Sequence, residues 1–140
     1  MKKLLISLLI CHLWPVATSA QTERPFKAYL TNEEYEVYLR INLYEQNIQV
    51  PGQELYGELP GYLGKKHNSF CWVITSAEVS GKQASLQLIN DYGSEDLTAT
   101  LTQKNDSVFT LKQERGSTLK VPKNGKWQKL PKTLEFKRKK

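Results

Sequence analysis

Residues 35–44 read YEVYLRINLY, and this stretch decides the fold class. Its positions alternate without a slip between an apolar side and a more polar side. The apolar side carries Tyr35, Val37, Leu39, Ile41 and Leu43, and the other side carries Glu36, Tyr38, Arg40, Asn42 and Tyr44. A period of two residues, rich in Val, Ile and Tyr, predicts a half-buried β-strand.

A helix is the alternative interpretation of this stretch. Residues 31–34 read TNEE, which resembles a helix-capping box. A helix would however place Tyr35, Leu39 and Leu43 on one side with polar Asn42 and Gln46. The alternation is cleaner, so we expect a strand.

The remainder of the chain predicts short strands separated by turns. Pro51-Gly52 suits the centre of a type II turn, and Asn124-Gly125 is typical of a type I′ hairpin turn. Further strands are expected at 46–50, 55–63, 70–79, 83–90, 97–103, 107–113, 118–121, 126–130 and 133–137.

This spacing, with turns every 8–12 residues and no clear helix, predicts an all-β fold of about eight or nine short antiparallel strands. The links have hairpin length, which favours a sequential meander closed into a small up-and-down barrel; a two-sheet β-sandwich is the alternative. We expect one domain over residues 21–140.

Three segments resemble a group of small secreted proteins from Gram-negative bacteria. They read LYEQNIQVPGQE (43–54), GELPGY (57–62) and NDYGSEDL (90–97), and the likeness covers most of residues 26–136. The resemblance implies export but no activity, so it assigns no functional residue. The layout is also similar to lipocalin-like barrels in strand count and hairpin spacing, although the lipocalin Gly-x-Trp signature is missing.

Residues 1–20 read as a cleavable signal peptide. Lys2 and Lys3 precede an apolar run that ends before Pro15, and small residues lead to Ala20. The run is too short for a membrane span, which predicts cleavage after Ala20 and a periplasmic or secreted protein without a transmembrane segment.

Charge is distributed unevenly along the predicted mature chain. Residues 120–140 contain nine Lys or Arg and only Glu135 as an acid, while residues 21–119 contain nine bases and 13 acids. The chain ends in Lys137, Arg138, Lys139 and Lys140. Such asymmetry indicates an anionic partner or a solubilising end. Nucleic acid is not expected, because the protein is exported and the basic end lacks interleaved stacking aromatics.

Aromatic side chains supply the candidate binding residues. Tyrosine offers a large rigid ring and a hydroxyl for recognition, which suits sugar or protein ligands. The candidates are Tyr38 and Tyr44 on the polar side of the first strand, Tyr56 and Tyr62 on the strand over 55–63, and Trp72.

Catalytic and metal-binding signals are sparse. After signal removal His67 and Cys71 are the only residues of their types, and we expect Cys71 to be a small buried side chain rather than a nucleophile. The turn over 90–96 is rich in oxygen ligands but lacks the ligand order of a calcium loop. We therefore expect neither metal nor cofactor.

These features favour a monomeric, non-enzymatic binding protein. In the first version the barrel holds a small apolar or amphiphilic ligand. In the second, a tyrosine-rich outer surface binds an envelope protein or glycan, or inhibits an enzyme.

Overall fold

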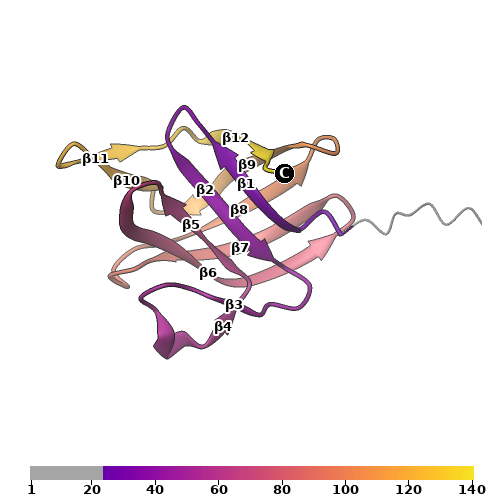
Figure 1. Ribbon diagram of the computed structural model, residues 1–140, viewed down its shortest axis with the longest axis horizontal. Coiled ribbons are helices and arrows are strands. Elements are labelled where there is room, and N and C mark those ends of the chain that lie inside the picture. Colours follow the sequence, from indigo (N-terminus) through magenta and orange to yellow (C-terminus); the bar gives the residue numbers. More distant parts are fainter. Residues whose placement is uncertain (1–23) are drawn as a thin grey trace, which may run out of the picture.

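The computed structural model describes residues 24–140 and shows a closed antiparallel β-barrel of eight strands (Figure 1). The all-β prediction and the barrel are confirmed. The predicted signal peptide and the cleavage point after Ala20 lie outside the described residues. Within the described part of the chain, no helix has the length and apolar character needed to cross a membrane.

The wall of the barrel follows the chain with two interruptions. Its strands, in order around the barrel, are β1 (Lys27–Asn32), β12 (Thr133–Arg138), β9 (Val108–Gly116), β8 (Asp96–Gln103), β7 (Gln83–Asn90), β6 (Asn68–Ser80), β5 (Gly61–Lys65) and β2 (Val37–Asn42). Sequential strands pair with each other, as the hairpin-length links predict, and β1 pairs with β12 to close the barrel.

Two small hairpins interrupt this meander. The first contains β3 (Ile48–Gln49), the 3₁₀ turn η1 (Glu54–Tyr56) and β4 (Glu58–Leu59), and it packs against the outside of the wall. The second contains β10 (Lys120–Lys123) and β11 (Lys126–Lys129), joined at Asn124 and Gly125, whose φ angles are both positive as a type I′ turn requires. Figure 1 shows the two hairpins on different sides of the barrel.

The barrel interior is filled by large apolar side chains. Alternate residues of every wall strand point inward, as the period of two predicts. Fully buried members include Trp72, Phe26, Phe109, Phe136, Leu30, Leu39, Leu63, Ile74, Leu86, Leu88, Leu101 and Leu111. Buried Leu119, Val121 and Leu130 of the second hairpin join the same core.

A second, smaller core lies outside the wall. Val50 and Tyr62 pack there with Cys71 and Val73, under the hairpin of β3 and β4. This explains the long apolar run of β6: its residues 70–74 are buried alternately against the interior and beneath the outer hairpin.

The sequence missed or misjudged three segments. Strand β1 was not predicted, although it pairs with both β2 and β12. The strand expected over 55–63 is wrong, because the chain there forms η1, β4 and the start of β5 instead of one strand. The third error concerns the basic C-terminus.

Residues 137–140 are not a loose solubilising end. Lys137 pairs with Val108 on one side and Thr31 on the other. The backbone N–H of Arg138 donates to the Ser107 carbonyl, and that of Lys139 donates to the Tyr29 carbonyl, both at 2.8 Å. Residues 137–139 therefore help to close the barrel.

Candidate binding surface

The outer face of β12, β1, β2 and β5 carries a row of alternating cations and aromatic rings. Tyr29 lies opposite Arg40, and Arg40 lies opposite Tyr62 on the next strand. Lys139 joins the other end of this row through its backbone hydrogen bond to Tyr29. In the neighbouring row, Lys137 lies opposite Thr31, which lies opposite Tyr38. We call Tyr29, Tyr38, Arg40, Lys137 and Lys139 the cation–tyrosine wall.

The tyrosines of this wall support one another. The rings of Tyr29 and Tyr38 are stacked, with centroids 5.5 Å apart and planes at 5°, and Tyr38 meets Tyr62 edge to face at 5.8 Å. Gly64 lies opposite Tyr38, and a Cβ atom there would collide with the Tyr38 ring. The absence of a side chain at position 64 therefore lets the Tyr38 ring lie over the sheet.

Burial raises the pKa of Tyr38, and a hydrogen bond with Tyr62 adds to the effect. Tyr62 is itself buried by the hairpin of β3 and β4, whereas Tyr29 keeps 39% of its surface exposed. Tyr29 is thus the ring that the wall offers to solvent; it stacks on Tyr38, and Tyr38 in turn packs against Tyr62.

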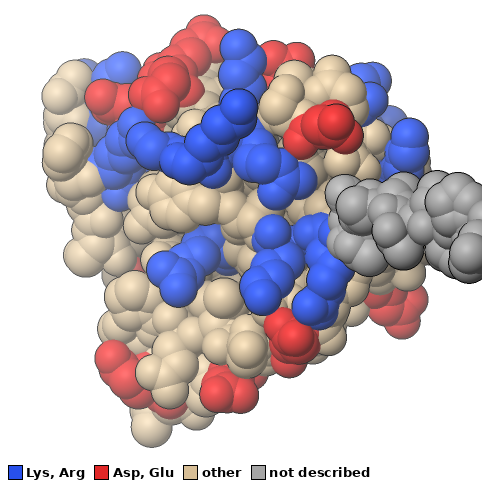
Figure 2. Space-filling view, turned by 45° about the vertical axis from the view of Figure 1, so that its right-hand side comes forward, with Lys and Arg blue, Asp and Glu red and all other residues tan. Residues whose placement is uncertain are grey.

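The cations of the wall have few anionic neighbours. Among the described residues, no carboxylate oxygen lies within 4.0 Å of the side-chain nitrogens of Arg40, Lys137 or Lys139. All three side chains are exposed. Figure 2 shows Lys and Arg gathered across the middle of this face, with carboxylates toward its edges. Alongside the hydrogen bond from Lys66, the nearby Lys139 charge helps to lower the pKa of Glu33, but none of the three cations is held in a close ion pair, so they are available for an external anion.

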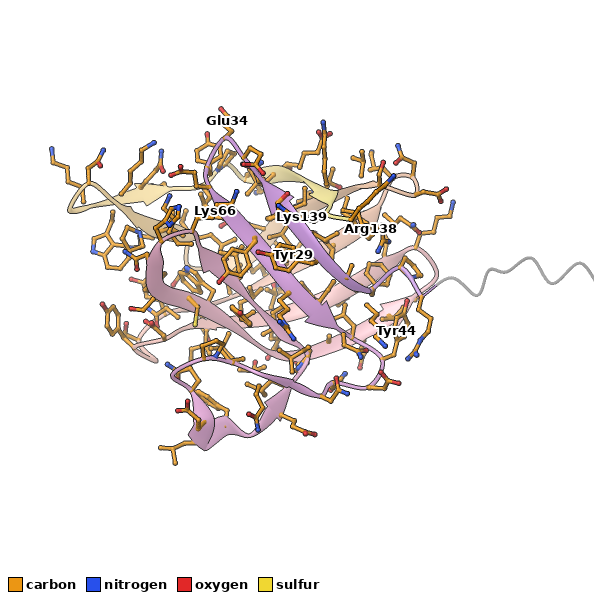
Figure 3. The ribbon with its side chains drawn as sticks, in the orientation of Figure 1. Tyr29, Glu34, Tyr44, Lys66, Arg138 and Lys139 are labelled. Atoms are coloured by element: carbon orange, nitrogen blue, oxygen red, sulfur yellow. The ribbon has the colours of Figure 1, made fainter. Side chains whose placement is uncertain are left out.

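Ion pairs frame the wall at its edges. Lys66 contacts Glu33 at 2.9 Å, and the buried Lys65 contacts Glu36 at 3.1 Å. These contacts lower the pKa of both carboxyl groups, first through the hydrogen bonds from the lysines. Figure 3 places Lys66 and Lys139 beside Tyr29, so the wall extends toward Lys66.

Arg138 and Lys140 differ from the two lysines of the wall. The Arg138 side chain closes one end of the barrel: its guanidinium lies over the Phe109 ring at 5.3 Å, and its Nε donates to the Asp106 carbonyl at 3.0 Å. Lys140 lies at the same end, beside an open hollow of about 500 Å³ that Arg24 and Arg138 also line. Of the four predicted anion-facing residues, Lys137 and Lys139 therefore belong to the wall.

The predicted aromatic site is corrected in three places. Trp72 is in the barrel core with 1% of its surface exposed, and its Nε1–H donates to the Lys120 carbonyl at 2.9 Å. Tyr62 is buried beneath the outer hairpin. Tyr56 is exposed but lies in η1, so it does not share a strand face with Tyr62 as predicted.

Tyr38 and Tyr44 have separate roles. Tyr38 belongs to the wall, in agreement with its predicted place on the outer side of the strand. Tyr44 lies away from Tyr29 in Figure 3, packs beneath the Arg24 guanidinium at 4.9 Å, and accepts a hydrogen bond from the Phe26 N–H. Tyr44 therefore packs at the end of the barrel where the chain enters β1.

Sequence reasoning missed Tyr29, Arg40, Tyr92 and Trp127 as surface candidates. A signal existed for Arg40, which alternates outward in the stretch that decides the fold. Tyr29 could not be placed because β1 was not recognised. Trp127 is 52% exposed and Tyr92 is 71% exposed, on the second hairpin and on the β7–β8 turn.

The residues considered for catalysis or metal binding have other surroundings. Cys71 is buried in the outer core, as expected, and burial raises the pKa of its thiol to about 11, with Asp91 adding to the effect. His67 lies in an exposed turn. In the 90–96 turn, the Asn90 side chain donates a hydrogen bond to the Ser94 hydroxyl and accepts one from the Ser94 backbone N–H. These bonds organise the turn itself. No group of three His, Cys, Asp or Glu side chains in residues 24–140 is placed to hold a metal ion.

None of the family models, curated proteins and solved structures compared with the chain matches it. Function must therefore be inferred from the surface and the core of this molecule.

Proposed function

We propose that this protein is an exported, non-enzymatic binding protein that recognises an anionic saccharide through its cation–tyrosine wall. The observation that carries the proposal is the row formed by Lys139, Tyr29 and Arg40, whose cations form no ion pair within 4.0 Å among the described residues. Carboxylate, sulfate or phosphate groups of a glycan or a lipopolysaccharide core would pair with these side chains.

The filled interior favours a surface ligand over a ligand held inside the barrel. Trp72, Phe109 and Phe136 occupy the space that a lumen would need, and each is at most 1% exposed. A small ligand inside would have to displace close-packed side chains, at a cost of several kcal/mol. The second version of the sequence-based hypothesis is therefore the one we adopt.

The composition of the wall favours a saccharide over a protein partner. Protein–protein interfaces are enriched in tyrosine and arginine but depleted in lysine, and this wall places Lys137 and Lys139 beside its exposed ring. Lysine is a hydrated point charge that pairs readily with anions spaced along a polymer. The exposed ring of Tyr29 offers a negative π face to the C–H groups of a sugar ring.

Binding of four polymers to the mature protein tests this proposal. The probes are heparin, polygalacturonate, neutral dextran and double-stranded DNA of similar length. We expect the two acidic polysaccharides to bind at about 10 mM salt and to weaken steeply by about 100 mM, because the screening length falls from about 30 Å to about 10 Å. Dextran should bind at least tenfold more weakly.

Two results would overturn the proposal. One is failure of both acidic polysaccharides to bind at low salt. The other is DNA binding that matches heparin in affinity at every salt concentration, which would show attraction to charge without recognition of a saccharide.

A further inference from the structure

Three aromatic rings meet at the end of the barrel that the second hairpin covers. Phe70 is buried at the start of β6, and Trp127 lies over it edge to face, with centroids 5.1 Å apart. Tyr92, from the β7–β8 turn, contacts both: its centroid is 6.0 Å from that of Phe70 and 6.5 Å from that of Trp127. We call this cluster the aromatic corner.

The two exposed rings of the corner form a right-angled surface. The planes of Tyr92 and Trp127 meet at 85°, and these side chains keep 71% and 52% of their surface exposed. An exposed Trp and an exposed Tyr from separate chain segments, backed by a buried Phe, form a larger apolar surface than scattered single residues do. Of these three rings, only Phe70 belongs to the barrel core. The core therefore does not require Tyr92 and Trp127 at these exposed positions.

The corner is held rigidly. Lys120 on β10 contacts Glu95 in the β7–β8 turn at 3.2 Å, so the two segments that supply the rings are joined by an ion pair. The Lys120 carbonyl also accepts the hydrogen bond from Trp72 in the barrel core. Buried Val121 fixes the hairpin to the same core. Rings carried on backbone segments that are tied together lose less conformational entropy when they bind a ligand.

The two segments of the corner carry opposite charges: the β7–β8 turn around Tyr92 contains Asp91, Glu95 and Asp96, and the hairpin around Trp127 is basic. The hairpin over 120–129 carries four lysines and no acid: Lys120, Lys123, Lys126 and Lys129. Lys120 is paired with Glu95, and the other three are exposed. A ligand that fits this environment carries both a ring to stack and a negative charge.

The corner is connected to the cation–tyrosine wall along the surface. Lys66 lies beside Tyr29 (Figure 3), and, after the hydrogen bond from Lys65, the nearby charges of Lys123 and His67 help to lower the pKa of the Glu36 carboxyl group. Lys66 and His67 are adjacent in the β5–β6 turn. Basic side chains, interspersed with Glu33 and Glu36, therefore lead from Tyr29 through this turn to the second hairpin.

We propose that Tyr92 and Trp127 form a second subsite, which stacks a pyranose ring further along the same anionic saccharide chain. The inference rests on the proposed function and adds a requirement for length: a short fragment reaches the wall alone, while a long chain contacts both places. Two joined contacts strengthen binding because the second contact is intramolecular.

Heparin fragments of two lengths test this inference. The short probe is a tetrasaccharide, and the long probe is a chain of about twenty sugars, for which linkage predicts an added gain in affinity. We expect Trp127→Ala and Tyr92→Ala to weaken binding of the long chain by about tenfold, as loss of an aromatic contact does, and to leave the tetrasaccharide unchanged. Trp127→Phe, which keeps a ring, should retain most of the affinity.

Trp127 also gives a direct readout. Trp72 is buried, so in the mature protein Trp127 is the exposed indole. The long chain should change Trp127 emission and protect it from acrylamide, and the tetrasaccharide should do neither.

The outcomes separate the two proposals. If Trp127→Ala and Tyr92→Ala bind the long chain as tightly as the wild type while Arg40→Gln weakens both probes, the second subsite is refuted and the proposed function stands. If neither probe binds the wild-type protein, both are refuted.

Discussion

Two walls of the same barrel cover the same apolar interior with different side chains. The outer face of β7, β8 and β9 carries short polar residues and single charges: Ser85, Gln87, Thr98, Thr100, Thr102, Thr110 and Lys112. The outer face of β12, β1 and β2 carries the cation–tyrosine wall. The interior is equally buried behind both.

The difference teaches which residues the barrel needs. Mostly polar side chains, threonine foremost, cover β7, β8 and β9, and threonine suits strands. Tyr38 and Tyr62 have a structural role on the other wall, because they pack with the outer core. Tyr29 stacks on Tyr38, whereas Arg40, Lys137 and Lys139 form no ion pair within 4.0 Å among the described residues, which is the physical reason for proposing a ligand there.

The largest expected effect is a loss of stability when an interior side chain is truncated, compared with truncation on the outer face of β7, β8 and β9. Phe109→Ala removes a fully buried ring that contacts Phe26 at 6.0 Å, and should lower the free energy of unfolding by about 3–5 kcal/mol. Thr102→Ala, on the outer face of β8, should change it by less than about 0.5 kcal/mol. Urea unfolding measures both, and equal effects would contradict a packed interior.

At the C-terminal strand, removal of the backbone and removal of the charge should have different effects on stability. Deletion of residues 137–140 removes the hydrogen bonds that Arg138 and Lys139 donate, together with the pairing of Lys137, and should cost about 3 kcal/mol of stability. The matched variant Lys137→Gln/Lys139→Gln/Lys140→Gln keeps the backbone and should stay within about 0.5 kcal/mol of the wild type. Thermal melts distinguish the two. A truncated protein as stable as the wild type would show that the barrel closes without these residues.

A smaller loss of stability is expected at Gly64, where the Tyr38 ring lies against the backbone. Gly64→Ala places a Cβ against the Tyr38 ring, and displacement of the ring should cost about 1–3 kcal/mol. In a Tyr38→Ala background the same change should cost much less, and a double-mutant cycle measures the difference. Equal costs in both backgrounds would mean that the ring is not what restricts position 64.

The alternation in residues 35–44 predicted the central feature of the fold because each inward residue of β2 is buried by the barrel. It could not locate the cation–tyrosine wall. Tyr29 meets Arg40 only through pairing of β1 with β2, and Lys139 reaches Tyr29 only when the barrel closes. Trp72 and Trp127 show the same limit: both lie in strands, and only the packing of the second hairpin decides which is buried.

The smallest expected effect concerns pH. Burial raises the pKa of Asp91, whose Oδ1 has no hydrogen-bond partner, so its ionised form is disfavoured in the folded state. The protonated form therefore contributes stability below the unfolded pKa of about 3.9, and that contribution is lost as pH rises through the folded pKa. Asp91→Asn should gain stability relative to the wild type as pH rises from about 3 to 7. Denaturant melts across this range measure the difference, and a constant difference would contradict the burial.

Matched removal of charge from the two walls tests the central claim most directly. One variant is Arg40→Gln/Lys137→Gln/Lys139→Gln, and its control is Lys82→Gln/Lys104→Gln/Lys112→Gln, which removes three exposed lysines away from the cation–tyrosine wall. Heparin affinity at about 10 mM and about 100 mM salt compares them at equal net charge. We predict that the first variant loses at least tenfold in affinity at low salt and most of its salt dependence, while the control stays within about threefold of the wild type. Equal losses in the two variants would contradict a binding wall and leave only the net charge of the protein.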